Sequence, residues 1–313
     1  MCKGIEFNNM RSKKIESIIY AILAAVFYAI SMPLSKLLLE KISPTYMASF
    51  LYFGAGIGVG IIYVIRTIRH RDTGEKLSKP DLPYVLGMII LDIAAPILLM
   101  IGLKTVTSSN ASLLNNFEIA ATSLIALFVF KETISKRLWA ALLLITISSM
   151  LLSIEDISSF TFSYGSIYIL SAAICWGLEN NFTRKISSKD IYQIVVIKGI
   201  FSGLGSLIVA LILKQNLPNF QYIAYALILG IVAYGLSIFF YVKAQHELGA
   251  AKTSAFYAIA PFIGALLSFI ILRESITKFY ILALSIMIAG SVLVVIDTLI
   301  ASNIQIHNRS YNK

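Results

Sequence analysis

The chain has 313 residues, of which 58% are hydrophobic and only 13% are charged, and its mean hydropathy is +0.82. Soluble proteins contain about 45–50% apolar and about 25% charged residues, so this composition excludes an ordinary soluble domain. The net charge of +10 would also suit a nucleic-acid-binding protein. Basic residues at the ends of membrane helices explain it better, and nucleic acid is not an expected partner.

Long apolar runs separated by short polar breaks recur along the whole chain. A helix needs about 20 apolar residues to cross a bilayer, and these runs are too long and continuous for the strands of a barrel. We therefore expect an all-α integral membrane protein with ten transmembrane helices. The predicted spans are 17–39, 45–65, 82–103, 110–130, 137–154, 164–183, 190–213, 221–242, 250–271 and 279–300.

The basic residues predict how these spans are oriented. With the N-terminus inside, 19 of the 26 Lys and Arg residues fall on the inner side, six on the outer side, and Lys198 within a span. Because inner loops of membrane proteins are enriched in Lys and Arg, we expect a multi-pass protein of the cytoplasmic membrane. Its tails, 1–16 and 301–313, would both be cytoplasmic. The first run is too long for a signal-peptide core and no clear cleavage site follows it, so we expect a retained span.

The chain repeats itself after its midpoint. Asn110–Glu132 (NASLLNNFEIAATSLIALFVFKE) corresponds to Lys252–Glu274 (KTSAFYAIAPFIGALLSFIILRE), and both segments end on a basic residue followed by Glu. These echoes predict a first repeat at 17–154, a linker at 155–163 and a second repeat at 164–300. Each repeat holds five spans, so the second would enter the membrane from the opposite side. Inverted repeats of this kind build many transporters.

Four ionisable residues lie within the predicted spans: Asp92, Glu118, Glu179 and Lys198. Charges inside a bilayer are costly and usually face a cavity or a partner. Asp92 and Glu118 are predicted near the midplane, where two carboxylates favour binding and release of a proton, unless each is a neutral group that only bonds neighbouring helices. Glu179 and Lys198 are expected to form a structural ion pair, with a direct role in substrate binding as the alternative.

Other polar and aromatic residues accompany these charges. Ser112, Asn115, Glu118 and Thr122 recur at spacings of three and four and so share one helix face, which either lines a cavity or bonds neighbouring helices. Tyr28, Trp176 and Tyr257 could stack on a substrate or simply pack. The candidate cavity residues are Asp92, Asn115, Asn116, Glu118, Thr122, Tyr28, Trp176, Glu179, Asn180 and Tyr257.

Glycine and proline mark places where helices pack closely or bend. Gly54, Gly58, Gly199 and Gly203 lie inside spans, which favours close helix packing over a nucleotide-binding loop. Three prolines, Pro33, Pro96 and Pro261, interrupt spans one, three and nine and are expected to kink them.

The sequence contains no recognisable catalytic set. His246-Glu247 lacks the second histidine of a zinc-protease helix, and Cys2 and Cys175 have neither metal-site nor disulfide spacing. We expect no enzyme activity, no metal and no cofactor. The expected partners are the lipid bilayer, a small-molecule substrate and, as candidate coupling ions, protons. A monomer and a homodimer are both compatible with the sequence.

Ten spans in two halves, each closing its fourth span on a basic-Glu pair, resemble the drug/metabolite transporter superfamily of the EamA type. Ala24–Lys36 with Ala172–Arg184, and Thr107–Glu132 with Gly249–Glu274, carry the resemblance. It implies a central cavity lined by spans one, three, four, six, eight and nine, and alternating access without ATP. Many relatives have a proline in span four, where this chain has Ile119 beside Glu118.

The resulting expectation is a secondary active transporter, an exporter or exchanger, that moves a small polar metabolite such as an amino acid and uses protons as a candidate coupling ion. The alternatives are an uncoupled facilitator and a phosphate or nucleotide-sugar exchanger. A membrane sensor or scaffold that transports nothing is a different class, which the absence of any soluble domain makes less favourable.

Overall fold

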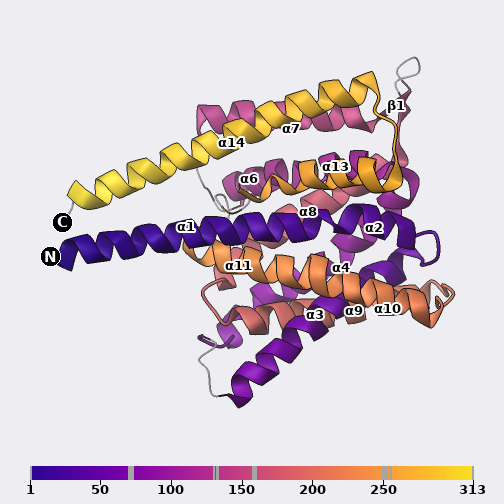
Figure 1. Ribbon diagram of the computed structural model, residues 1–313, viewed down its shortest axis with the longest axis horizontal. Coiled ribbons are helices and arrows are strands. Elements are labelled where there is room, and N and C mark those ends of the chain that lie inside the picture. The colour runs from indigo at the N-terminus through magenta and orange to yellow at the C-terminus, as the bar shows by residue number, and fades with distance from the viewer. Residues whose placement is uncertain are drawn as a thin grey trace.

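The computed structural model describes residues 2–69, 74–129, 131, 134–156, 161–248, 253 and 256–311. It is a helical bundle in which the N-terminal start of α1 and the C-terminal end of α14 lie at the same end (Figure 1). We name this the inner end and the opposite one the outer end, following the orientation predicted from the basic residues.

The first half runs from α1 to α7. Its elements are α1 (Cys2–Ala29), α2 (Ser31–Leu38), α3 (Pro44–Ile68), the short 3₁₀ turn η1 (Lys79–Asp81), α4 (Leu82–Thr105), α5 (Ser108–Leu114), α6 (Phe117–Phe128) and α7 (Lys136–Ser153). Two short antiparallel strands, β1 (Ile154–Asp156) and β2 (Thr161–Phe162), connect it to the second half.

The second half runs from α8 to α14. Its elements are α8 (Tyr164–Ile186), α9 (Ile191–Ile212), α10 (Phe220–Leu229), the π-helical turn η2 (Gly230–Leu236), α11 (Ser237–Leu248), α13 (Ala260–Leu272) and α14 (Lys278–Tyr311).

Eight stretches of the described chain are helical, long and apolar enough to cross a membrane. They are Ile15–Leu38, Pro44–Ile68, Lys79–Thr105, Ser108–Phe128, Lys136–Ser153, Ile191–Ile212, Phe220–Leu248 and Lys278–Asp297. The other two predicted spans coincide with α8, which carries many polar residues, and with α13, whose 13 residues cover the later part of the predicted span 250–271. Residues 250–252, 254 and 255 of that span lie outside the described residues. The all-helical membrane fold is thus confirmed, whereas the count of ten spans stays a prediction.

The packing of the helices relates the two halves. The corresponding second and seventh spans, α3 and α9, pack together, as do the fifth and tenth, α7 and α14 (Figure 1). In addition α1 packs on α11, and α8 packs on α4. α1 and α11 belong to the first and eighth spans, and α8 and α4 belong to the sixth and third. These two contacts are equivalent when the two halves are exchanged. The set of helix contacts is therefore the one expected for two related halves.

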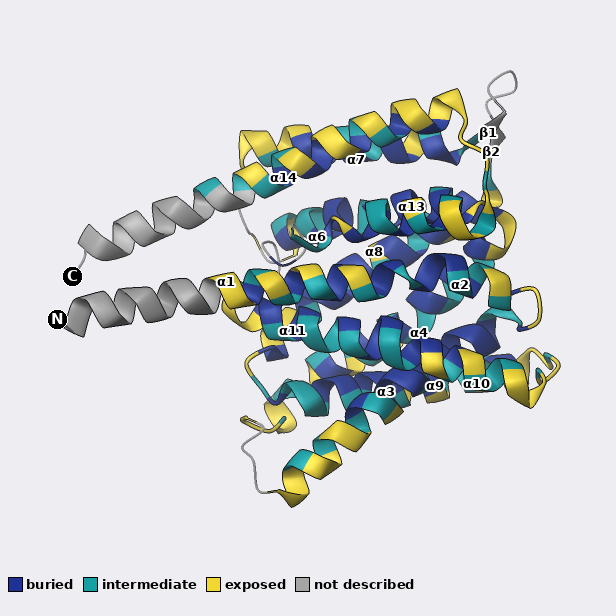
Figure 2. Ribbon diagram, in the orientation of Figure 1, coloured by how far each residue is buried: buried dark blue, intermediate teal, exposed yellow. Residues whose placement is uncertain are grey.

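Apolar side chains lie on the outside of this bundle as well as in its core. Exposed positions lie on the outward faces of α3, α7 and α14, and buried positions lie between the helices (Figure 2). Large apolar residues such as Ile61, Leu143 and Ile212 are among the exposed ones. An apolar exterior of this kind suits a lipid environment and would be unfavourable in water.

Glycines allow α3 to approach its neighbours closely, as the sequence predicts. A Cβ atom on Gly199 would lie 2.3 Å from the backbone nitrogen of Gly56, and one on Gly54 would lie 2.2 Å from the carbonyl oxygen of Leu227. Neither position has room for a side chain, because the obstacle is backbone. The α3–α9 contact thus brings together two backbones that larger residues would hold apart.

The fourth and ninth spans are both interrupted, at corresponding places. α5 ends at Leu114 and α6 begins at Phe117, so Asn115 and Asn116 form a turn. In the ninth span, residues 258 and 259 form a turn before α13 begins at Ala260. Pro261 explains the second break because it cannot donate a helical hydrogen bond. The first break has no proline and relies on the two asparagines, which favour turns.

The other two predicted kinks differ from each other. Pro33 lies in the first turn of α2, directly after the break between α1 and α2 at Ile30. Pro96 lies inside α4, which continues through it as one helix. The kink expected to interrupt the third span is therefore not a break, because a helix can lose one backbone hydrogen bond without ending.

The glycine contact leads to a stability prediction. Gly199→Ala should destabilise the protein by about 1–3 kcal/mol, because the added methyl group must displace the backbone of α3. Gly60→Ala is the matched control, since a Cβ atom there has only Val196 Cγ2 nearby, at 3.6 Å. Melting temperatures in detergent should fall for the first variant and hold for the second. Equal melting temperatures would contradict the close α3–α9 contact.

Candidate substrate cavity

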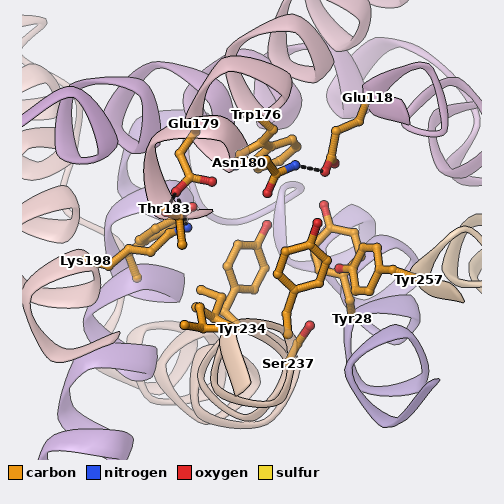
Figure 3. Close-up of a pocket in the computed structure, with 14 residues that line it drawn as sticks. Tyr28, Glu118, Trp176, Glu179, Asn180, Thr183, Lys198, Tyr234, Ser237 and Tyr257 are labelled. Carbon is orange, nitrogen blue, oxygen red and sulfur yellow. Dashed lines mark hydrogen bonds and ion pairs between the residues drawn. The ribbon is translucent and has the colours of Figure 1, made fainter. Parts of the chain in front are cut away.

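A cavity of about 60 Å³ lies between the two halves of the bundle (Figure 3). Its lining combines acidic, amide and hydroxyl groups with a large share of aromatic rings. The lining residues are Tyr28, Tyr52, Glu118, Trp176, Glu179, Asn180, Thr183, Lys198, Tyr234, Ser237, Ile238, Tyr241, Val242 and Tyr257.

The break in the fourth span places Glu118 at this cavity. Glu118 lies in the first turn of α6, where the positive end of the helix dipole favours a carboxylate. Its Oε1 accepts a hydrogen bond of 2.6 Å from Asn180 Nδ2 of α8. Within the described part of the chain Glu118 forms no ion pair, so an amide is what holds this acid in place.

Helix α8 supplies one wall of the cavity. Trp176, Glu179 and Asn180 are spaced by three and four residues and therefore share one helix face. Figure 3 shows Glu118 and Glu179 on opposite sides, with Trp176 and Asn180 between them. One face of α8 thus carries both the amide that binds Glu118 and a second carboxylate.

Lys198 of α9 binds two carboxylates at once. Its Nζ lies 2.9 Å from Glu179 Oε1, the partner predicted from the sequence, and 3.1 Å from Asp92 Oδ2 of α4. Asp92 is fully buried, and the Lys198 and Glu179 side chains are 7% and 2% exposed. Two acids and one lysine leave this cluster with one negative charge when all three are ionised.

Hydroxyl groups complete the Lys198 cluster. Tyr52 donates a hydrogen bond of 2.8 Å to Asp92 Oδ1, and Thr183 donates one to Glu179. A buried ion pair is tolerated only when hydrogen bonds replace the lost water, and these two hydroxyls supply such bonds. The cluster ties α3, α4, α8 and α9 together next to the cavity.

Aromatic rings form the opposite wall. Tyr28 is central to it, with ring centroids 5.7 Å from Tyr234, 5.8 Å from Tyr257 and 6.4 Å from Trp176. Tyr234 comes from the π-helical turn η2, and such turns are frequent at functional sites. Figure 3 shows these tyrosines facing the side of the cavity that carries Glu118, Asn180 and Glu179.

Seven of the residues singled out from the sequence line the cavity: Tyr28, Glu118, Trp176, Glu179, Asn180, Lys198 and Tyr257. The other four lie elsewhere. Asp92 contacts Lys198 but does not line the cavity, and Asn116 donates a hydrogen bond of 3.0 Å to Ser291 of α14. Asn115 and Thr122 are buried among the helices around α6, and the Thr122 carbonyl oxygen accepts a hydrogen bond from Asn181.

The residues of the predicted polar stripe thus do not all line the cavity. Glu118 lines the cavity, whereas Asn115 and Thr122 are buried and do not line it. The turn at Asn115 and Asn116 interrupts the helical spacing between Asn115 and Glu118, while Thr122 lies four residues after Glu118 on the same helix α6 and outside the cavity lining. Sequence reasoning also missed Tyr52, Thr183, Tyr234, Ser237 and Tyr241. Thr183 could have been found, since it lies four residues after Glu179 on the same helix.

A protein-family comparison identifies this architecture. The model of the EamA-like transporter family matches residues 15–154 and again residues 163–296. The chain belongs to the EamA-like transporter family. The family points to a membrane transporter rather than to an enzyme, and the double match supports two related halves.

Two curated proteins are similar to this EamA chain over most of their length. An uncharacterized transporter of Methanothermobacter thermautotrophicus is 29% identical over 81% of this chain and 78% of its own. The uncharacterized transporter YyaM of Bacillus subtilis is 23% identical over 90% of this chain and 91% of its own. A protein of known crystal structure shares the fold, with a TM-score of 0.67 and 14% identity over 90% of this chain and 97% of its own.

The Lys198 cluster predicts unequal effects for two substitutions. Lys198→Met should destabilise this EamA protein by about 3–5 kcal/mol, because it leaves two buried carboxylates without their cation. Asp92→Asn should destabilise the protein much less, since it preserves the Lys198–Glu179 pair. The asparagine side chain also keeps an oxygen that can accept the hydrogen bond from Tyr52. Thermal unfolding in detergent distinguishes them. A Lys198→Met protein as stable as Asp92→Asn would show that the cluster does not hold the helices together.

Proposed function

We propose that this EamA protein is a secondary transporter of the cytoplasmic membrane that moves a small polar metabolite bearing an ammonium group, as amino acids and simple amines do. One observation carries the proposal. Glu118, a carboxylate without an ion-pair partner among the described residues, lines a cavity at the break of a membrane helix. Ionisable groups placed in this way inside a membrane usually serve a substrate or an ion.

The two breaks support transport through the centre of the molecule. The fourth and ninth spans are interrupted at corresponding turns, and paired interruptions of this kind are the best pointer to the binding site of an inverted-repeat transporter. Glu118 and Tyr257 lie beside these breaks and both line the cavity. We therefore propose ten spans in two oppositely oriented halves, with alternating access to this cavity.

Two charged residues are candidates for closing the outer end. Lys36 of α2 donates hydrogen bonds of 2.6 Å to the carbonyl oxygens of Leu103 and Val106, at the end of α4. Glu274, which follows α13, accepts bonds of 2.6 and 2.9 Å from the backbone nitrogens of Ser108 and Ser109. These contacts hold α2 and α13 against α4 and α5, so opening the outer end would have to break them.

We propose that Glu118 exchanges a proton for the substrate cation. Glu118 interacts electrostatically with two charged residues, Glu179 and Lys198, and with the phenols of Tyr28 and Tyr257. A protonated Glu118 would be neutral and release a cation, whereas an ionised one would bind it. The phosphate or nucleotide-sugar alternative is disfavoured, because the lysine that lines the cavity is already bound by two carboxylates.

Coupling through Glu118 is testable in liposomes. Glu118→Gln should abolish substrate accumulation driven by a pH gradient, because the amide cannot take up a proton. Exchange of labelled for unlabelled substrate should persist at substrate concentrations raised to offset the weaker binding. Substrate binding to the wild type should tighten as pH rises, since the ionised acid binds the cation, and should be flat with pH in the variant. Full pH-driven accumulation by Glu118→Gln would contradict the coupling role.

The outer closure yields a separate accessibility prediction. In a variant whose native Cys2 and Cys175 are replaced by serine, Ser237→Cys places a thiol at the cavity. Adding Glu274→Gln should increase its labelling by a membrane-impermeant maleimide applied from the side that carries Glu274, because the bonds to Ser108 and Ser109 weaken. Glu40→Gln, an exposed acid in the loop after α2, is the matched control. Equal labelling in all three proteins would exclude Glu274 from the closure.

A further inference from the structure

The charges around the cavity do not balance. Asp92, Glu118 and Glu179 are three carboxylates, and Lys198 is the one basic residue among the described residues that line the cavity. With every group ionised, the cluster and Glu118 together carry two negative charges in excess. Buried charges without compensation are costly, so a positively charged ligand would stabilise this arrangement and a negatively charged one would worsen it.

The lysine is not free to receive a carboxylate from a ligand. Lys198 Nζ is within 3.1 Å of oxygens from both Asp92 and Glu179. A third carboxylate would have to displace one of these acids and leave it buried without a cation. Free amino acids carry a carboxylate as well as an ammonium group, so they satisfy Glu118 but meet repulsion at the rest of the site.

The aromatic wall adds attraction for a cation. Tyr28, Trp176, Tyr234, Tyr241 and Tyr257 all line the cavity, and the ring centroids of Tyr241 and Tyr257 are 5.0 Å apart. The Tyr28 ring is tilted or perpendicular to each of its neighbours, at 41° to Tyr257, 61° to Tyr234 and 89° to Trp176. Faces and edges therefore surround the space from several directions. Aromatic faces attract ammonium groups, and clusters of them form cages for organic cations.

Unused hydroxyl groups point to the same ligand. The phenol oxygens of Tyr28 and Tyr234 are buried and interact with each other, but neither forms a hydrogen bond of good geometry within the described chain. Buried polar atoms are normally hydrogen-bonded. A phenol oxygen can accept a bond from the N–H of an ammonium group even while its own O–H is directed at a neighbouring phenol, so a ligand of this kind would use accepting positions that the protein leaves open.

From these observations we infer that the cavity binds a compact organic amine that carries a positive charge and no carboxylate. The ammonium group would lie between Glu118 and the tyrosine faces, with its apolar part against Trp176 and Tyr257. The volume of about 60 Å³ is far below the roughly 300–1,000 Å³ of pockets for drug-sized ligands, so the ligand is small. This inference deepens the proposed function and depends on the same cavity.

Ligand pairs that differ by a single carboxylate test the inference. Purified protein in detergent is titrated with isobutylamine against valine and with tyramine against tyrosine, and its melting temperature is followed, because a ligand of the native state raises it. The amines should bind at least about tenfold more tightly than the amino acids, as expected when one unfavourable charge is removed. The same four compounds are then tested for flux in liposomes.

Two variants show whether the cavity is responsible. Glu118→Gln should weaken amine binding by roughly tenfold or more, because the countercharge is lost. Tyr28→Leu should also weaken it while preserving an apolar surface, because leucine has no aromatic face and no hydroxyl. Glu247→Gln, which removes an exposed acid at the end of α11, should leave binding unchanged. Both site variants must unfold cooperatively for the comparison to count, and Tyr28→Phe is a milder substitute if Tyr28→Leu does not.

The outcomes separate the ligand class from the transport function. Valine or tyrosine binding as tightly as its amine overturns the inference and leaves transport intact, and so does the absence of amine binding while an amino acid is transported. Amine binding that Glu118→Gln weakens by tenfold or more, with no flux of any compound in liposomes, supports the ligand class and contradicts transport. Amine binding that survives Glu118→Gln and Tyr28→Leu places the ligand elsewhere and also overturns the inference.

Discussion

The contact of Lys198 with two carboxylates is the interaction on which the rest of the site depends. It allows Asp92 and Glu179 to be buried between α4, α8 and α9, at distances of 3.1 and 2.9 Å. Because Glu179 is held there, α8 is fixed in rotation, and Asn180 on the same face reaches Glu118. Because the lysine is bound by these two acids, no basic residue of the cavity lining balances Glu118 when it is ionised. The Lys198 cluster thus positions the side chains of α8 at the cavity and also determines the net charge around it.

The two halves share a scaffold and differ in their chemistry. Both interrupt the fourth span of the half at the same place, and both end it on a basic residue with a positive φ, 57° for Lys131 and 52° for Arg273. After the break, however, the first half has Glu118-Ile119 and the second has Ala260-Pro261. Proline secures the break in one copy, and in the other the same place carries an acid. Both copies therefore keep the break, while only the first copy carries an acid beside it.

The sequence predicts those parts of the fold that follow from the lengths of the apolar runs and from the internal repeat. Runs of apolar residues predicted the helices, and the echo of Asn110–Glu132 in Lys252–Glu274 predicted two halves, which the double family match supports. The pairing of Lys198 with Glu179 follows from their similar depth on neighbouring spans. The lengths of apolar runs, the internal repeat and the position of a residue along its span can all be taken directly from the sequence.

The remaining features of the site depend on contacts between distant segments. Nothing near Asp92 in the sequence indicates Tyr52 or Lys198, which reach it only after α3, α4 and α9 have packed. Tyr234 enters the cavity through a π-helical turn, whereas the sequence pattern predicted regular helix there. The break at Asn115 and Asn116 contains no proline, so the sequence pattern predicts a continuous stripe with Asn115 and Thr122 at the cavity, whereas the cavity lining includes neither of them.

The central claim is that ligand and proton compete for Glu118, and proton release on binding measures this directly. An amine is added to the purified protein in weakly buffered detergent solution, and the pH change is followed with an indicator dye. Under conditions where Glu118 is protonated, the account predicts proton release by the wild type and none by Glu118→Gln, with ligand binding verified separately. Equal proton release by both proteins, or saturating binding to the wild type without any release, would contradict it.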